Sequence, residues 1–269
     1  MPQVRSTIAI ARIYATSARS RTVARIRPRF EIYRQIYDDC IATDRALLDD
    51  FERHEVLAGV RAVYSVGPGF GPLEVELMRR GIDLGYAEPY ERFADELEQR
   101  AAAAGVVDRI AERHRGTFDT ATVRGRYDLV IAAHSWQSYM QQRAPLDRAL
   151  ALCTGGRMMI VTQDLDSPLN RVFDARRAPE LDARRVSSWL GEEGVPHELR
   201  PLRTIVRRSV LLDDDGRLTP SAYGLATFLT NRDRDELGDG YLDELRVTIA
   251  AHANGIEHVR GLIVIPADD

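Results

Sequence analysis

The sequence has no lysine and only two cysteines, Cys40 and Cys153, among its 269 residues. Neither cysteine belongs to a Cys-x-x-Cys pair or a Cys/His cluster, which excludes a disulfide framework and a zinc site as the basis of the fold. No window approaches the roughly 18 consecutive apolar residues of a membrane-spanning helix. We therefore expect a soluble, cytoplasmic protein without a membrane partner.

All 37 basic residues are arginine, against 41 acidic residues, for a formal net charge of -4. GC-rich coding in a bacterium explains this bias more simply than a charged partner does. Residues 1–29 are rich in arginine and contain no acidic residue. That composition is found in transit peptides and nucleic-acid arms, but an amphipathic helix, or in part a misplaced start codon, is the favoured interpretation. Because the remainder is acidic, we expect no nucleic-acid partner.

Apolar segments alternate with helical patterns through the middle of the chain. The expected strands are residues 61–66, 82–87, 126–133 and 157–162. The expected helices are residues 72–78, 90–104, 146–152 and 183–194. This alternation predicts an α/β fold with a Rossmann-like, doubly wound and mostly parallel sheet.

The two ends of the chain depart from this alternation. A helical pattern at residues 30–54 predicts an N-terminal helical cap, residues 1–58. A β run at 202–212 and a last apolar strand at 261–266 predict an antiparallel pair that completes the sheet. Helical patterns at 220–229 and 242–253 lie between them. They predict a helical insertion at about 213–259, within a Rossmann-like domain of residues 59–269.

A glycine loop follows the first expected strand. Gly67, Gly69 and Gly71 lie where a ligand can approach the backbone and where a helix begins. Glu88 follows the second strand, where a carboxylate can accept both hydroxyls of a ribose. Pro72 stands at the third glycine position of the nicotinamide fingerprint GxGxxG. The spacing GxGxG is used by many S-adenosylmethionine (SAM) enzymes, so SAM is the favoured cofactor.

These segments resemble class I SAM-dependent methyltransferases, most closely the histamine N-methyltransferase-like branch. The resemblance runs from about residue 31 to residue 267 and is carried by residues 63–71, Glu88-Pro89, 127–133 and 262–265. Ser65 stands where most class I enzymes have an acidic residue, and the histamine branch tolerates serine there. The resemblance implies that the three glycines contact the methionine part of SAM, that Glu88 accepts the ribose, and that Thr117 and Phe118 lie near the adenine.

The resemblance also implies residues near the methyl group. Ala133 and His134 would end the strand that faces it. In histamine enzymes the positions of His134 and His258, the latter just before the final strand, carry amides that touch the substrate. An acidic residue on the N-terminal helix, matched here by Asp44, completes that pocket. Both amides have become histidine, so histamine is not the expected substrate.

Methyl transfer requires an aligned nucleophile and, for a protonated nucleophile, a base. An imidazole can deprotonate a hydroxyl or an ammonium, so His134 and His258 are candidate bases, and Asp44 could orient a cation. Either histidine could instead be structural. Four aromatic residues could line the substrate pocket, or could pack in the core: Tyr33, Tyr37, Trp136 and Tyr139.

The first functional hypothesis is a SAM-dependent methyltransferase of a small amine or hydroxyl compound in bacterial secondary metabolism. A second has the SAM amine attack its own γ-carbon, giving azetidine-2-carboxylate and methylthioadenosine. A nicotinamide oxidoreductase and a non-catalytic SAM-binding partner are further alternatives. The chain lacks the Asn/Asp-Pro-Pro-Tyr/Phe and Pro-Cys motifs of base methylation. Asp164 and Asp166 lack an acidic partner at position 134, so no metal is expected. The oligomeric state is left open.

Overall fold

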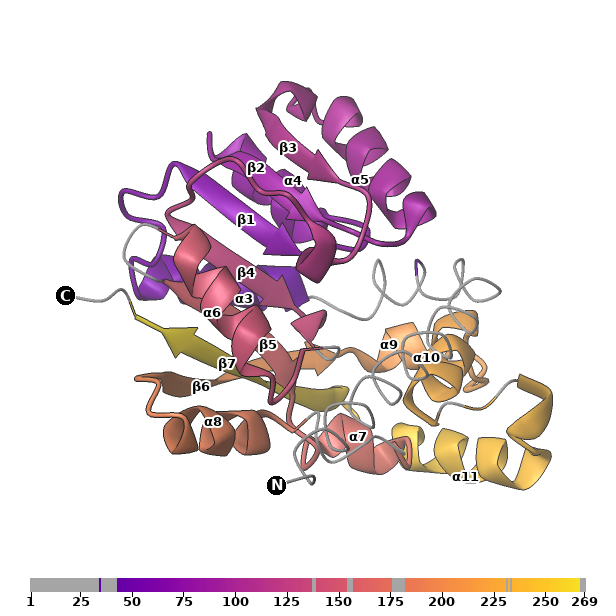
Figure 1. Cartoon of the computed structure of the whole chain (residues 1–269). Coiled ribbons are helices and arrows are strands. Elements are labelled where there is room, and N and C mark those ends of the chain that lie inside the picture. The colour runs from indigo at the N-terminus through magenta and orange to yellow at the C-terminus, as the bar shows by residue number, and fades with distance from the viewer. Residues whose placement is uncertain are drawn as a thin grey trace, which may run out of the picture.

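The structure is a computed structural model that describes residues 34, 43–136, 139–153, 157–175, 182–230, 232 and 234–266. Within these residues one seven-stranded sheet has the order β3-β2-β1-β4-β5-β7-β6 (Figure 1). Its strands are β1 (Ala62–Val66), β2 (Asp83–Ala87), β3 (Ile110–His114), β4 (Leu129–Ala133), β5 (Met158–Gln163), β6 (Glu198–Val206) and β7 (Ile256–Ile265). Strand β7 runs antiparallel to β5 and β6, while the pairs from β3 to β5 are parallel. The predicted Rossmann-like sheet with an antiparallel C-terminal strand is confirmed.

Helices cover both faces of the sheet, which explains why its central strands are almost entirely apolar. One face packs against α3 (Thr43–Arg53), α4 (Pro72–Arg79) and α5 (Glu91–Ala103). The other packs against α6 (Arg143–Leu152) and α8 (Ala183–Glu192). Along β4 the side chains alternate between the two clusters, with Leu129 and Ile131 on the α3 side. Val130 and Ala132 lie on the α6 side.

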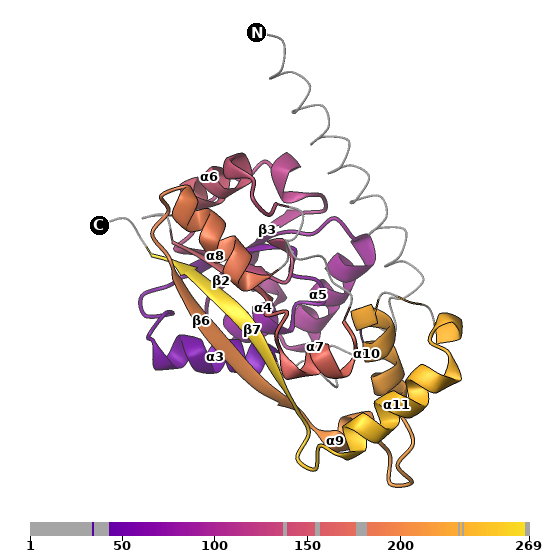
Figure 2. The ribbon, with the colours of Figure 1, turned by 90° about the horizontal axis from the view of Figure 1, so that it is seen from below.

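A group of helices gathers at one end of the sheet and has its own apolar cluster. It consists of α7 (Pro168–Val172), α9 (Arg208–Leu211), α10 (Pro220–Thr230) and α11 (Asp239–Ala250). Strands β6 and β7 run side by side toward this group (Figure 2). Short 3-10 turns are η2 (Val107–Arg109), η3 (Phe118–Thr120) and η6 (Arg234–Glu236). Among the described helices, none is both long and apolar enough to span a membrane.

The last two strands differ from their predicted bounds. The β run expected at 202–212 ends at Val206, because residues 208–211 form α9 and bury Leu211 in the helical cluster. The final strand begins at Ile256 rather than at residue 261. Its first residues pair with the end of β6, from Ile256 opposite Val206 to Arg260 opposite Leu202. Backbone pairing, rather than an apolar run, forms this part of the strand.

Candidate functional site

The candidate site lies at the edge of the sheet where the parallel strands end. After β1 the chain builds β2 and β3 on one side, and then returns to place β4 on the other side of β1. In doubly wound sheets this change of direction leaves a crevice that binds ligands. The glycine loop follows β1, Glu88 follows β2, and His134 follows β4. The fold therefore brings the predicted cofactor and methyl-group residues to one edge.

The three glycines of the loop have different surroundings, although all have left-handed φ angles of 66°, 60° and 70°. A Cβ atom at Gly67 would lie 2.6 Å from Ser135 Cβ, and one at Gly71 would overlap the Leu97 side chain. A Cβ atom at Gly69 would meet nothing within 4 Å. Gly67 and Gly71 are thus required by packing. Over Gly69, by contrast, the space beside the backbone is open.

Glu88, which follows β2, is hydrogen-bonded to this glycine loop. Its side chain is 2% exposed. Its carboxylate accepts hydrogen bonds from the backbone N–H groups of Gly69 at 3.0 Å and Tyr90 at 2.9 Å. Burial raises the pKa of Glu88 to about 7, although the two backbone hydrogen bonds by themselves lower this pKa. The carboxylate is therefore a buried acceptor directly beside the open position over Gly69.

The raised pKa of Glu88 predicts a pH dependence of stability. The folded state holds the proton up to about pH 7, whereas the unfolded chain releases it near 4.5. The proton on Glu88 therefore adds about 3 kcal/mol to the free energy of unfolding. This stabilisation is fully present below pH 4.5 and is lost as the pH rises through 7. Urea unfolding of the protein and of E88Q across pH 4.5 to 8 tests this. The free energy of unfolding should fall relative to that of E88Q, and parallel curves would contradict the assignment.

Ser65 and Glu74 form a buried pair that sequence reasoning missed. Ser65 Oγ donates to Glu74 Oε1 at 2.6 Å, which ties β1 to the first turn of α4. The sequence analysis also did not predict a contact of Ser135, whose Oγ donates a hydrogen bond to the Val66 carbonyl at the end of β1. An acidic residue two positions after Pro72 was a weak signal for the first contact. The contact between Ser135 and Val66 joins residues that are distant in sequence, so no local sequence pattern predicts it.

His134 occupies the turn that ends β4. Its φ is 58°, an uncommon conformation for a residue with a side chain. Its backbone N–H donates to the Val161 carbonyl of β5 at 2.9 Å. The next residue is Ser135, which contacts Gly67. His134 is thus half-buried in a strained turn beside the glycine loop, and Ala133, the last residue of β4, lies directly before it.

His258 does not lie in a loop before the final strand, as expected, but within β7. It pairs with Thr204, whose Oγ1 donates to the His258 carbonyl. Gln163, the last residue of β5, lies opposite Arg260, so His258 lies beyond the end of β5. The correction keeps His258 at the ligand edge, with β5 between it and His134. Two strand spacings separate β4 and β7, roughly 10 Å.

The aromatic residues near the predicted adenine site form part of the core. Phe118, Trp136 and Tyr139 are 1%, 0% and 5% exposed. The rings of Trp136 and Tyr139 lie 5.2 Å apart, and the Tyr139 hydroxyl accepts the Phe118 N–H at 3.1 Å. Thr117 is the half-buried residue that precedes η3. Trp136 and Tyr139 hold this turn in place rather than lining an open pocket, so their role as substrate contacts stays a prediction.

Three further candidates cannot be placed. Tyr33 and Tyr37 lie outside the described residues, and so does the side chain of Asp44, whose backbone belongs to the first turn of α3. Across the described part of the chain, no group of three or more His, Cys, Asp or Glu side chains could hold a metal ion.

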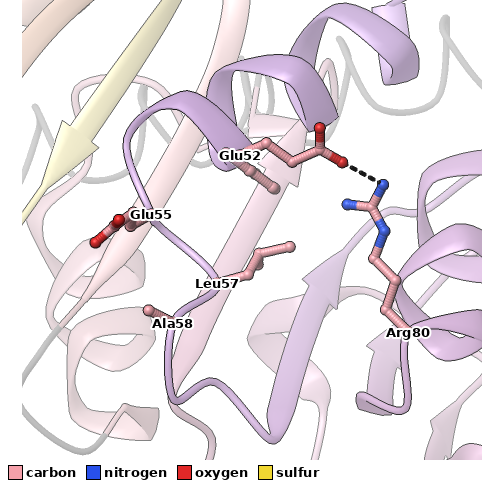
Figure 3. Close-up of a pocket in the computed structure, with 6 residues that line it drawn as sticks. Glu52, Glu55, Leu57, Ala58 and Arg80 are labelled. Carbon is pink, nitrogen blue, oxygen red and sulfur yellow. Dashed lines mark hydrogen bonds and ion pairs between the residues drawn. The ribbon is translucent and has the colours of Figure 1, made fainter.

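An open pocket lies away from this edge (Figure 3). It is lined by Phe51, Glu52, Glu55, Leu57, Ala58 and Arg80. Glu52 and Arg80 form an ion pair across it at 2.8 Å. Phe51 and Glu52 belong to the end of α3. The other residues lie in the segments that lead from α3 to β1 and from α4 to β2, at the edge of the sheet opposite the glycine loop. No predicted site residue lines this pocket.

No family model matches the sequence. Three curated relatives, each called an uncharacterized methyltransferase, come from Mycobacterium bovis and two strains of Mycobacterium tuberculosis. Each is 28% identical over 170 residues, which cover 61% of this chain and 62% of the relative. The alignment thus spans less than two thirds of their length.

The solved structure of a methyltransferase shares the architecture. The plantazolicin methyltransferase BamL, in complex with a desmethyl analogue and S-adenosylhomocysteine (SAH), is 12% identical and superposes with a TM-score of 0.51 over 88% of this chain and 91% of BamL. The magnesium protoporphyrin IX methyltransferase of Synechocystis with bound SAM is 18% identical, with a TM-score of 0.48 over 66% of this chain and 86% of that one. The likeness to BamL shows that the chain has a Rossmann-like methyltransferase fold.

Proposed function

We propose that this protein is a SAM-dependent methyltransferase that acts on an amine or hydroxyl group of a small molecule, in bacterial secondary metabolism. The observation that carries this proposal is the open backbone at Gly69 beside the buried carboxylate of Glu88. The nucleoside of SAM offers ribose hydroxyls that can donate to such a carboxylate. Pro72 is the first residue of α4, so the third glycine of a nicotinamide site is missing.

The chain's residues can divide the work of methyl transfer. SAM, when bound, supplies an electrophilic methyl group on a positively charged sulfur. The glycine loop and Glu88 hold the nucleoside and methionine parts, and the turn at His134 faces the acceptor. Transfer of that methyl group to the acceptor's lone pair would leave SAH and a proton on the acceptor. The His134 imidazole takes the proton that the acceptor releases.

The comparisons support the general activity more than the acceptor. The three mycobacterial relatives carry the name methyltransferase, and BamL is named for plantazolicin. We also propose membership of the histamine N-methyltransferase-like branch, with an acceptor other than histamine because positions 134 and 258 are histidine. No contact in the described residues favours the cyclase, the oxidoreductase or the non-catalytic partner over this function.

Incubation of the purified protein with SAM and a panel of amines and phenols, read by mass spectrometry, tests the proposal. We expect SAH to accumulate only when a methylated acceptor also appears. Methylthioadenosine from SAM alone would overturn it in favour of the cyclase. Failure to bind SAH in calorimetry would reject the cofactor itself.

The H134Q variant is the matched probe of the base. It restores the amide that the histamine branch has at this position, and we expect turnover to fall about a hundredfold while SAH affinity is kept. Turnover unchanged in H134Q would show that His134 is not the base.

A further inference from the structure

A serine and a histidine meet at a distance from the candidate site. Ser187 lies on α8, and His197 directly precedes the first residue of β6. Ser187 Oγ lies 2.7 Å from His197 Nε2. Strand β6 runs in the same direction as β5, because both pair antiparallel with β7. The start of β6 therefore lies at the edge of the sheet opposite the glycine loop, away from the residues assigned to methyl transfer.

The turn after α8 holds the histidine in place. Gly194 adopts a left-handed φ of 69°, which reverses the chain at the end of the helix. The Val195 N–H then donates to the Leu190 carbonyl at 2.9 Å, which fixes Val195 against the helix. The Val195 carbonyl in turn lies 2.8 Å from His197 Nδ1. The backbone of a short, packed turn thus sets the position of the imidazole.

These two contacts decide which atom carries each proton. A carbonyl oxygen only accepts, so His197 Nδ1 carries a proton and donates to Val195. In the neutral imidazole Nε2 is then an acceptor, and Ser187 Oγ donates a hydrogen bond to it. The hydroxyls of Thr230 and Thr248, which also lie in helices, donate to the carbonyl four residues earlier. The Ser187 hydroxyl instead directs its proton at a base whose other nitrogen is held in place.

This arrangement has the parts of an activated nucleophile, which are a hydroxyl, a base and a group that orients the base. Ser187 and His197 are both half-buried, so neither is sealed in the core. Gly191 lies one turn after Ser187 on the same side of α8, and a Cβ atom there would meet nothing within 4 Å. The helix surface beside the hydroxyl is therefore open to a small reagent.

We propose that Ser187 is a nucleophile that His197 activates toward small activated esters of carboxylic acids. Ser187 Oγ forms a bond to the acyl carbon while its proton moves to His197 Nε2. The bond from the acyl carbon to the leaving oxygen breaks, and that oxygen takes the electron pair and then the proton from His197. The products are an acyl ester of Ser187 and a free alcohol or phenol, and the step is independent of SAM.

Reaction of the full chain with p-nitrophenyl acetate tests this proposal. The chain has no lysine, so the side-chain amines that such an ester also acylates are missing from it. Release of p-nitrophenol gives the rate, and peptide mass spectrometry locates the acetyl group. We expect the acetyl group on Ser187. H197Q keeps a hydrogen-bonding side chain but removes the base, so acetylation should be about a hundredfold slower.

S187A and S188A form a matched pair of variants, because Ser188 is the exposed neighbour of Ser187 on α8. S187A should lose the acetylated peptide and the fast release of p-nitrophenol, whereas S188A should keep both. Urea unfolding shows that each variant is folded before the rates are compared. The site of acetylation in the unaltered protein does not depend on any variant.

Three results would overturn the proposal. The unaltered protein could remain without an acetyl group, or could carry it on residues other than Ser187. Folded H197Q could also acetylate Ser187 as fast as the unaltered protein, which would leave His197 with a structural role. Because the assay contains no SAM, each of these results is distinct from a failure of the proposed methyltransferase function.

Discussion

An E88A variant is expected to bind SAH about a hundredfold more weakly than the unaltered protein at pH 8. Glu88 is the only carboxylate that hydrogen-bonds the glycine loop within the described residues, through Gly69. Two charge-assisted hydrogen bonds to ribose hydroxyls, at about 1.5 kcal/mol each, give a loss of this size. Calorimetric titration of SAH measures it.

E98Q serves as the matched control for E88A. Glu98 lies on α5, where it accepts a hydrogen bond from the Tyr86 hydroxyl at 2.6 Å and pairs with Arg115. Removal of its charge leaves the glycine loop untouched, so SAH affinity should be kept. Equal affinity of E88A and the unaltered protein would refute Glu88 as the ribose acceptor.

The same carboxylate gives SAH binding a defined pH dependence. Hydroxyl donors favour the ionised form of Glu88, whose pKa in the free protein is about 7. The affinity should therefore fall as the pH drops below 7, by up to about tenfold per unit. The E88Q variant has no proton to lose at this position, so its weaker affinity should lack this dependence. This comparison assigns the pH dependence to Glu88.

The central fold could be predicted because β1, β4 and β5 are buried on both faces and appear as continuous apolar runs. The edge strand β6 could not be bounded in this way. Its first residues, from Glu198 to Arg200, are exposed or half-buried and pair with β7 through the backbone. The start of β7 was missed for a related reason. Glu257, His258 and Arg260 interrupt the apolar pattern, although they lie within the strand.

The sequence could predict which residues lie at the candidate site, but not which other residues contact them. The sequence treats the three glycines of the loop alike. In the structure their surroundings differ. Leu97 of α5 covers Gly71, whereas Ser135, which follows β4, covers Gly67. Those contacts join residues far apart in the chain, and so does the pairing of Gln163 with Arg260. The roles of the predicted site residues in binding and catalysis stay predictions.

Two variants of the glycine loop, G71A and G69A, should rank in one order by their loss of stability and in the reverse order by their loss of SAH affinity. G71A adds a Cβ that overlaps Leu97 and forces a left-handed φ of 70° on alanine at the start of α4. Overpacking and backbone strain together should lower the free energy of unfolding by about 3 kcal/mol. G69A meets no neighbour within 4 Å, so only the strain of its φ of 60° remains, about 1 kcal/mol. Urea unfolding measures both losses.

SAH binding should rank the two variants in the other order. The added methyl group of G69A projects into the open space where the ligand would approach the backbone, so SAH affinity should fall at least tenfold in a protein that is still folded. G71A keeps that space open, and its folded fraction should bind SAH nearly as well as the unaltered protein. Titration at a temperature where both variants are folded makes the comparison. Normal SAH affinity in G69A would show that the ligand does not use this loop, whereas the predicted reversal would separate the loop's binding residue from its packing residue.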